Sequence, residues 1–276
     1  MGRKDISPTR ILLYAVLVLA ALVYLVPIYI LVNTGLKSFE AATLRQLWVP
    51  SMQPTIEPFV RAWRQLAPNF MNSVYLTIPA TIISCMIGSI NGYVFSKWRF
   101  KGADVLFVLI LFGMFIPYQS ILIPLVQFLR AIGLYGNLGG LILTHVVYGI
   151  PITTLIFRNY YMEVPDSLME ASYIDGLGMF QAYMKIVFPI SAPAFVVVII
   201  WQFTNIWNEF LFAIILTHRP SLQPITVALR NLAGSQIVEW NVQMAGAFLA
   251  ALPTLAVFIL LGKYFVRGLM AGSVKG

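Results

Sequence analysis

Residues 11–36 read ILLYAVLVLAALVYLVPIYILVNTGL and contain no Asp, Glu, Lys or Arg. A helix needs about 20 predominantly apolar residues to cross the hydrocarbon core of a bilayer, and this stretch is longer than that. The apolar core of a cleaved signal peptide spans only about 7–15 residues. Although the basic N-terminus would suit a signal peptide, the length of the stretch favours a retained membrane-spanning helix.

The rest of the chain has the same apolar character. Of its 276 residues, 59% are hydrophobic and 10% are charged, and the mean hydropathy is +0.84. Soluble domains are about 45–50% apolar and about 25% charged, and a chain of this length cannot bury so much apolar surface in one aqueous core. The composition therefore excludes an ordinary soluble enzyme, a disordered protein and a disulfide-rich secreted module, and it predicts a polytopic membrane protein.

Five further apolar runs follow the first. Pro68, Asn69 and Asn72 are turn formers and place the start of the second span near residue 72, whereas the fifth span continues past Glu209 because Phe210 to Leu216 stays apolar. Residues 35–71 are then an extracytoplasmic loop. We predict an all-α polytopic protein that forms a single transmembrane domain over 1–276, with six spans near 11–34, 72–95, 104–128, 138–158, 190–216 and 244–266.

The basic residues set the orientation. The chain has 18 Lys and Arg against 10 Asp and Glu, a net charge of +8, and the basic residues lie in short segments between the apolar runs. This placement indicates membrane topology rather than a nucleic-acid surface. Eleven basic residues fall on the side that holds the N-terminus and seven on the other. Because Lys and Arg concentrate in cytoplasmic loops, both termini are expected to be cytoplasmic.

The cytoplasmic loop at 159–189 holds four of the ten acidic residues. Ser167 followed by Glu170 has the spacing of a capping box, in which each side chain satisfies a free backbone amide at a helix start. Leu168, Met169 and Ser172 would then share one helix face, and Gly176 would supply a left-handed stop. The loop is predicted to form a short amphipathic helix, a glycine turn and a second helix from Phe180 to Val187, all outside the bilayer.

The same loop resembles a known motif. Glu170-Ala171-Ser172, three residues, Gly176, nine residues, Ile186, one residue and Phe188-Pro189 resemble the Glu-Ala-Ala loop of ABC-importer permeases. Ser172 stands for the second alanine of that pattern and Phe188 for a leucine. Trp207-Asn208-Glu209-Phe210 and the tail 264–276 are similar to segments of carbohydrate-importer permeases of the maltose-transport type.

The resemblance implies a type I ABC-importer permease core that forms half of a sugar pathway in a prokaryotic cytoplasmic (inner) membrane. It implies a second, usually different permease, two ATP-binding subunits with ATP and Mg²⁺, and an extracytoplasmic sugar-binding protein. No G-x-x-x-x-G-K-[ST] phosphate loop occurs, so this chain is expected to bind no cofactor and not to be an enzyme. The tail 269–276 would reach between the ATPase subunits. The resemblance assigns ATPase coupling to Glu170, Ala171, Ser172, Asp175, Gly176, Ile186 and Pro189.

The fifth span carries an unusual set of polar and indole side chains. Asn205, Asn208 and Glu209 have the spacing of one helix face, with Trp201 and Gln202 one turn earlier. Such groups either join helices in the membrane or line a pathway where aromatic rings and amides contact a sugar. Both interpretations remain open, as they do for His145, Asn91 and Gln119.

Two other function classes compete with an ABC importer. A secondary transporter or channel would need intramembrane ionisable groups, for which only Glu209 and His145 are candidates. A membrane enzyme would need a catalytic cluster, and neither His-Glu-x-x-His nor Gly-x-Ser-x-Gly occurs; no metal motif is present either. Segment 225–255 looks like permeases of the glucose/mannose type, so the expected substrate is a sugar of that kind.

Overall fold

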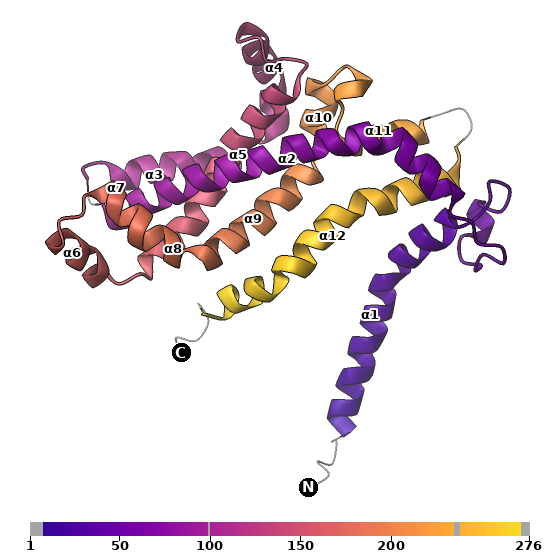
Figure 1. Ribbon diagram of the computed structural model, residues 1–276, viewed down its shortest axis with the longest axis horizontal. Coiled ribbons are helices and arrows are strands. Elements are labelled where there is room, and N and C mark those ends of the chain that lie inside the picture. Colours follow the sequence, from indigo (N-terminus) through magenta and orange to yellow (C-terminus); the bar gives the residue numbers. More distant parts are fainter. Residues whose placement is uncertain (1–7, 99, 235–237, 272–276) are drawn as a thin grey trace. The chain divides into compact units, whose positions relative to one another are not determined.

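The computed structural model describes residues 8–98, 100–234 and 238–271, and this part of the chain is helical with no β-strand (Figure 1). The all-α prediction is therefore confirmed. The tail residues 272–276 lie outside the described residues, as do 1–7, 99 and 235–237. The helices are α1 (Pro8–Gly35), η1 (Leu44–Gln46), α2 (Glu57–Lys97), α3 (Ala103–Phe112), η2 (Gly113–Phe115), η3 (Tyr118–Ile121), α4 (Leu122–Ala131), α5 (Leu138–Met162), α6 (Asp166–Ile174), α7 (Met179–Ala182), η4 (Tyr183–Val187), α8 (Phe188–Ile190), α9 (Ala192–Trp207), α10 (Leu211–Leu216), η5 (Pro220–Leu222), α11 (Ile225–Ala233) and α12 (Trp240–Ala271).

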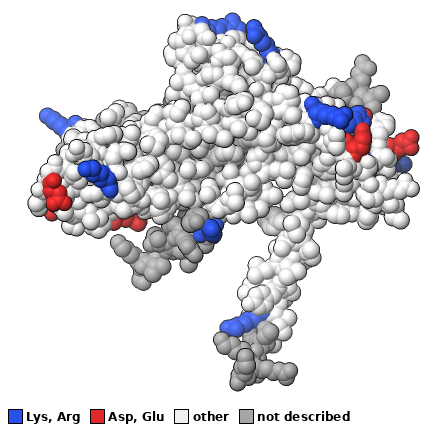
Figure 2. Space-filling model, in the orientation of Figure 1, with Lys and Arg blue, Asp and Glu red and all other residues white. Residues whose placement is uncertain are grey.

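Four helices are long and apolar enough to cross a membrane: α1, α2, α5 and α12 over Trp240–Lys263. Two further candidates are bent pairs, Ala103–Phe115 with Tyr118–Ala131 at 91° and Met179–Ile190 with Ala192–Trp207 at 77°. Acidic and basic side chains are sparse on the face drawn in Figure 2. The structure therefore has between four and six candidate spans, and six crossings with cytoplasmic termini stay a prediction.

The second long helix begins earlier than the predicted residue 72. Helix α2 begins at Glu57 and continues through Pro68 and Pro79, so residues 57–71 are helical rather than part of a loop. The asparagines do not end a helix. Asn69 Nδ2 donates to the carbonyl of Gln223 at 2.7 Å, and Asn72 Nδ2 donates to that of Ser221 at 2.8 Å. Amides that resembled turn formers instead hold the loop around η5.

The predicted continuous helices over 104–128 and 190–216 are also wrong. The first breaks at Ile116 and Pro117, whose ψ angles of 116° and 118° are extended, and a proline has no N–H to continue a helix. The second ends at Trp207 and resumes at Leu211. The Glu209 carboxylate accepts the N–H groups of Phe212 at 2.7 Å and Ala213 at 3.1 Å, which are free donors of the new helix.

The chain forms two compact units. The first comprises 1–67 and 229–251, where Ala62, Val242 and Ala245 form a small core. Arg61 Nη2 pairs there with Glu239 Oε2 at 2.5 Å. Helix α1 has an 18-residue apolar window with none of its residues buried. An exposed apolar surface of this kind is expected of a helix that contacts lipid.

The second unit comprises 68–228 and 252–276. Its helices α2 and α5 approach closely because Gly88 and Gly92 have no side chain. A Cβ at Gly88 would lie 2.2 Å from Thr153 Oγ1, and one at Gly92 would lie 2.7 Å from the Arg158 backbone nitrogen. Small residues four apart are typical of helix contacts in membranes. This G-x-x-x-G spacing is visible in the sequence itself.

Candidate functional site

The loop at 159–189 begins with a helix whose start differs from the prediction. Helix α6 begins at Asp166 with Pro165 as its N-cap, and no side chain caps it. The predicted Ser167–Glu170 capping box is therefore wrong, because Ser167 already lies within the first turn. The helix start is held instead by Lys97, whose Nζ donates to Val164 O at 2.5 Å and pairs with Asp166 Oδ1 at 2.7 Å.

The glycine stop after α6 is confirmed. Gly176 has φ +79°, a conformation that L-residues with a Cβ rarely adopt. The N–H of Leu177 donates to Ser172 O at 2.9 Å across the turn. The chain therefore reverses within two residues, and α6 is followed directly by the second helical segment of the loop, α7, η4 and α8.

The two faces of α6 differ from the predicted pattern at one residue. Met169 and Ser172 are buried as expected, and the Ser172 hydroxyl donates to Met169 O at 2.7 Å. Leu168 was expected on the same face but is 42% exposed, and Ile174 is 86% exposed. An apolar surface therefore points away from the protein. Of the predicted coupling residues, Ser172 is buried, Ile186 is half-buried, and Glu170, Ala171, Asp175, Gly176 and Pro189 are exposed.

Buried hydroxyl groups tie the second half of the loop to the long helices. The Ser89 Oγ on α2 lies 2.6 Å from Tyr161 Oη on α5 and 2.8 Å from Tyr183 Oη on η4. Tyr93 Oη donates to Met179 O at 3.1 Å. Segment η4 is a π-helix, a rare form that is frequent at functional sites. The loop is thus packed on α2 and α5 through side chains that are almost fully buried.

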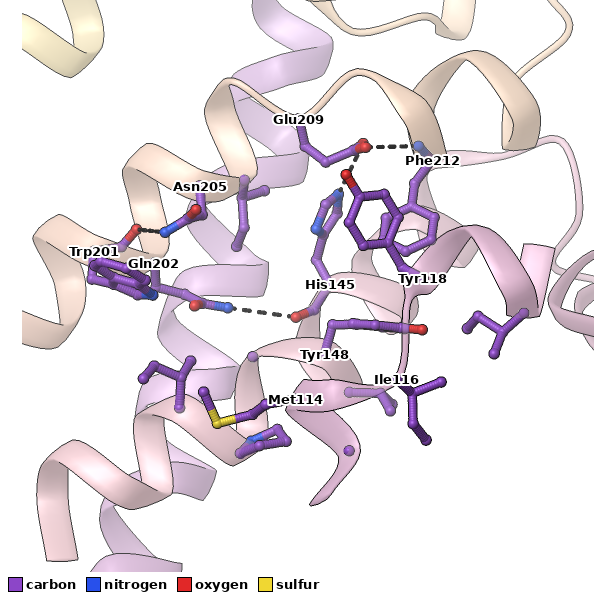
Figure 3. Close-up of a pocket in the computed structure, with 17 residues that line it drawn as sticks. Met114, Ile116, Tyr118, His145, Tyr148, Trp201, Gln202, Asn205, Glu209 and Phe212 are labelled. Atoms are coloured by element: carbon purple, nitrogen blue, oxygen red, sulfur yellow. Dashed lines mark hydrogen bonds and ion pairs between the residues drawn. The ribbon is translucent and has the colours of Figure 1, made fainter. Parts of the chain in front are cut away.

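A cavity of about 640 Å³ lies beside α5 and α9 (Figure 3). It brings together four of the five predicted pathway residues, namely Trp201, Gln202, Asn205 and Glu209, and adds His145. Asn208 and Gln119 are not among its lining residues. Asn91 lies elsewhere and donates to Thr154 Oγ1 at 3.4 Å between α2 and α5, which is helix packing.

The polar groups of the cavity come from three segments rather than from one helix face. Helix α9 contributes Asn205, whose Nδ2 donates to Trp201 O at 2.8 Å, whereas Glu209 lies beyond the end of that helix. The predicted common face of Asn205, Asn208 and Glu209 is therefore wrong. In Figure 3 His145 of α5 and Glu209 point toward one another, with 3.8 Å between His145 Nε2 and Glu209 Oε2.

Aromatic rings that the sequence analysis missed complete the wall. Tyr118, Tyr148 and Phe212 line the cavity, and the Phe212 ring centroid lies 5.5 Å from that of Tyr118 and 5.2 Å from that of Tyr148. Tyr148 follows His145 by three residues and so shares its helix face, a signal that the sequence did offer. Among the described residues no group of three or more His, Cys, Asp or Glu side chains is placed to hold a metal ion.

The comparisons with known proteins agree with this architecture. A probable ABC transporter permease of Pyrococcus horikoshii is 49% identical over 99% of this chain and 100% of that protein. The xylose/arabinose import permease of Haloferax volcanii is 34% identical over 96% and 94%. A bacterial ABC transporter involved in import of the acidic polysaccharide alginate has the same fold, with a TM-score of 0.81 at 21% identity over 96% of this chain and 99% of that one.

The family described as binding-protein-dependent transport system inner membrane component matches residues 84–271. The chain belongs to this family, as its loop motif predicted.

Proposed function

We propose that the chain is the permease subunit of an ATP-driven sugar importer and forms half of its pathway. The observation that carries the proposal is the loop at 159–189, which has the Glu-Ala-Ala spacing and folds into a helix with an unpartnered apolar side. Leu168, Tyr173 and Ile174 are exposed there although the loop itself is packed firmly on α2 and α5. An exposed amphipathic helix of this kind fits a hydrophobic groove on another protein.

The partner proposed for α6 is a cytoplasmic ATP-binding subunit. Glu170, Ala171, Asp175 and Gly176 are exposed on α6 or in the turn after it, Ser172 lies on the buried face of α6, and Ile186 and Pro189 lie in the second half of the loop. A carboxylate at such a surface can form charge-assisted hydrogen bonds with a cationic partner residue. Two such subunits would hold ATP and Mg²⁺, so hydrolysis would occur on them and not on this chain.

The family supports proposals for the remaining partners. A binding-protein-dependent system includes an extracytoplasmic binding protein, and we propose that this one binds a sugar. A second permease, different from this chain, would close the other half of the pathway. The assembly would lie in a prokaryotic cytoplasmic (inner) membrane, with α1 in lipid.

The pathway is proposed to run past α9. Trp201, Gln202, Asn205 and Glu209 are offered as residues that meet the substrate, since they line one cavity; Asn208 is kept in the proposal only as a neighbour of that cavity. The relative from Haloferax volcanii is named for xylose and arabinose, which supports a small sugar. A substrate of the glucose/mannose type remains our preferred choice within that class.

Ile174→Glu tests the docking surface. The substitution places a charge on the most exposed apolar residue of α6, and burying an unpaired charge in a partner groove is strongly unfavourable. We expect the ATP-binding subunits to be lost when the complex is purified in detergent through a tag on this chain. Met52→Glu is the matched control, because Met52 is 90% exposed in the loop before α2. Equal recovery of ATP-binding subunits with both variants would contradict the proposal.

A further inference from the structure

The cavity beside α5 and α9 contains a buried polar atom that has no partner. The His145 side chain is 7% exposed, and its Nε2 makes no hydrogen bond within the described structure. A buried polar group without a partner is costly. The atom faces Glu209 Oε2 across 3.8 Å, which is too long for a hydrogen bond, and an oxygen atom to one side of the line that joins them can lie within hydrogen-bond distance of both.

The Glu209 carboxylate is held in place on its other side. It accepts the N–H groups of Phe212 and Ala213 at 2.7 and 3.1 Å. The His145 ring packs edge-on against Phe212 with 5.8 Å between centroids, and Gln202 Nε2 donates to the backbone carbonyl of the same histidine at 3.5 Å. The gap between the two groups is therefore preorganised rather than a result of loose side chains.

The rest of the wall suits a ring with many hydroxyl groups. The indole of Trp201 is 51% exposed and lines the cavity together with Tyr118, Tyr148 and the amide of Asn205. The volume of about 640 Å³ lies in the usual range for small-molecule sites. No Lys or Arg is among the described lining residues, so the only formal charge contributed to the cavity, with the imidazole neutral, is the carboxylate of Glu209.

We infer that this cavity binds one ring of a neutral sugar, with a sugar hydroxyl bridging His145 Nε2 and the Glu209 carboxylate, and that it rejects sugar acids. The hydroxyl donates to the carboxylate and accepts from Nε2–H, so one group satisfies both atoms. A sugar carboxylate would face Glu209 without a compensating cation, and like charges at short range repel. The inference rests on the proposed sugar-permease function and adds the charge class of its substrate.

Protection of a thiol inside the cavity tests the inference without the extracytoplasmic binding protein, which would select the sugar beforehand. In a Cys85→Ala background, Met114→Cys places the only thiol of this chain on the cavity wall at an exposed position without a role in the proposed binding, and its alkylation by a water-soluble maleimide is followed in the complex reconstituted in nanodiscs. We expect D-glucose at millimolar concentration to slow alkylation at least threefold. D-glucuronate at the same concentration is expected to change the rate by less than a tenth of that effect.

The two anchoring residues are then changed in the same background. His145→Gln is expected to abolish protection by D-glucose, whereas His218→Gln preserves it, because His218 contacts Tyr135 outside this cavity. Glu209→Gln is expected to reduce the discrimination between D-glucose and D-glucuronate. Equal protection by both sugars, protection that survives His145→Gln, no protection by D-glucose, or a thiol that never reacts would each overturn the inference.

ATP-driven uptake by the same complex in proteoliposomes separates this inference from the proposed function. Uptake of neutral sugar without protection of the thiol would support the permease function and contradict the proposed binding site in the cavity. Protection of the thiol by D-glucose without ATP-driven uptake would support the binding site and contradict the importer function.

Discussion

Single residues decide where the helices of this protein stop. Glu209 has the spacing of a helix-face residue in the sequence, yet it lies beyond α9 and accepts two backbone N–H groups of α10. Sequence spacing could not reveal this, because an apolar run on both sides of one carboxylate reads as a continuous span. Gly176 is the opposite case: a glycine after a short helix predicts a left-handed turn, and the structure has φ +79° there.

Gly176→Ala tests the turn that follows α6. A Cβ at Gly176 would meet nothing within 4 Å, so the cost is purely conformational, about 1–2 kcal/mol for a left-handed residue with a side chain. That cost corresponds to a roughly 5–30-fold increase in local opening. We expect hydrogen–deuterium exchange over residues 166–178 to accelerate by this factor.

Gly178→Ala is the matched control for this turn. Its Cβ would also meet nothing within 4 Å, but its φ is −75°, which any residue adopts. Exchange over the loop is therefore expected to stay unchanged or to slow slightly. Equal acceleration in both variants would mean that the left-handed conformation of Gly176 does not hold the turn.

The elements were predicted well where one apolar stretch forms one helix. Helices α1 and α5 agree with the expected 11–34 and 138–158 to within a few residues, and Asn137 caps α5 by accepting from Gly140 N at 3.0 Å. The prediction failed where tertiary contacts override local signals. Helix α2 continues through Pro68, and its asparagines bond a distant loop instead of ending it, whereas Pro79 leaves α2 intact and Pro117 coincides with a break.

Gly92→Ala tests the close contact between α2 and α5. The added Cβ would lie 2.7 Å from the Arg158 backbone nitrogen and from Phe157 Cβ, and the helix backbones cannot move apart without loss of packing. Overpacking of this kind costs about 1–3 kcal/mol. We expect a lower thermal unfolding temperature of the purified chain in detergent. Gly262→Ala in α12, where nothing lies within 4 Å, is expected to leave that temperature unchanged or to raise it, and an equal loss in both would contradict the contact.

At the scale of the whole molecule, whether the two bent pairs cross the bilayer decides the topology of the chain. The two bent pairs, at 91° and 77°, either cross or turn back. If both cross, the segments after α2 and after α5 lie on the same side of the membrane as the N-terminus. If both turn back, the chain makes four crossings and the loop that carries α6 moves to the opposite side. The distribution of Lys and Arg favours six crossings, and the docking of α6 on a cytoplasmic subunit requires that the first bent pair crosses.

Single cysteines distinguish the two topologies. In a Cys85→Ala background, Glu40→Cys, Ala131→Cys and Ile174→Cys each place a thiol at an exposed position. With an impermeant maleimide applied to intact cells, six crossings predict labelling of the Glu40→Cys and Ala131→Cys variants, and labelling of the Ile174→Cys variant only after the cells are opened. Four crossings predict the reverse for the last two variants, because each re-entrant pair would return the chain to the side from which it entered. Labelling of Ile174→Cys in intact cells would contradict both the six-span topology and the cytoplasmic docking of α6, whereas the Glu40→Cys variant should label in either case and serves as the internal reference.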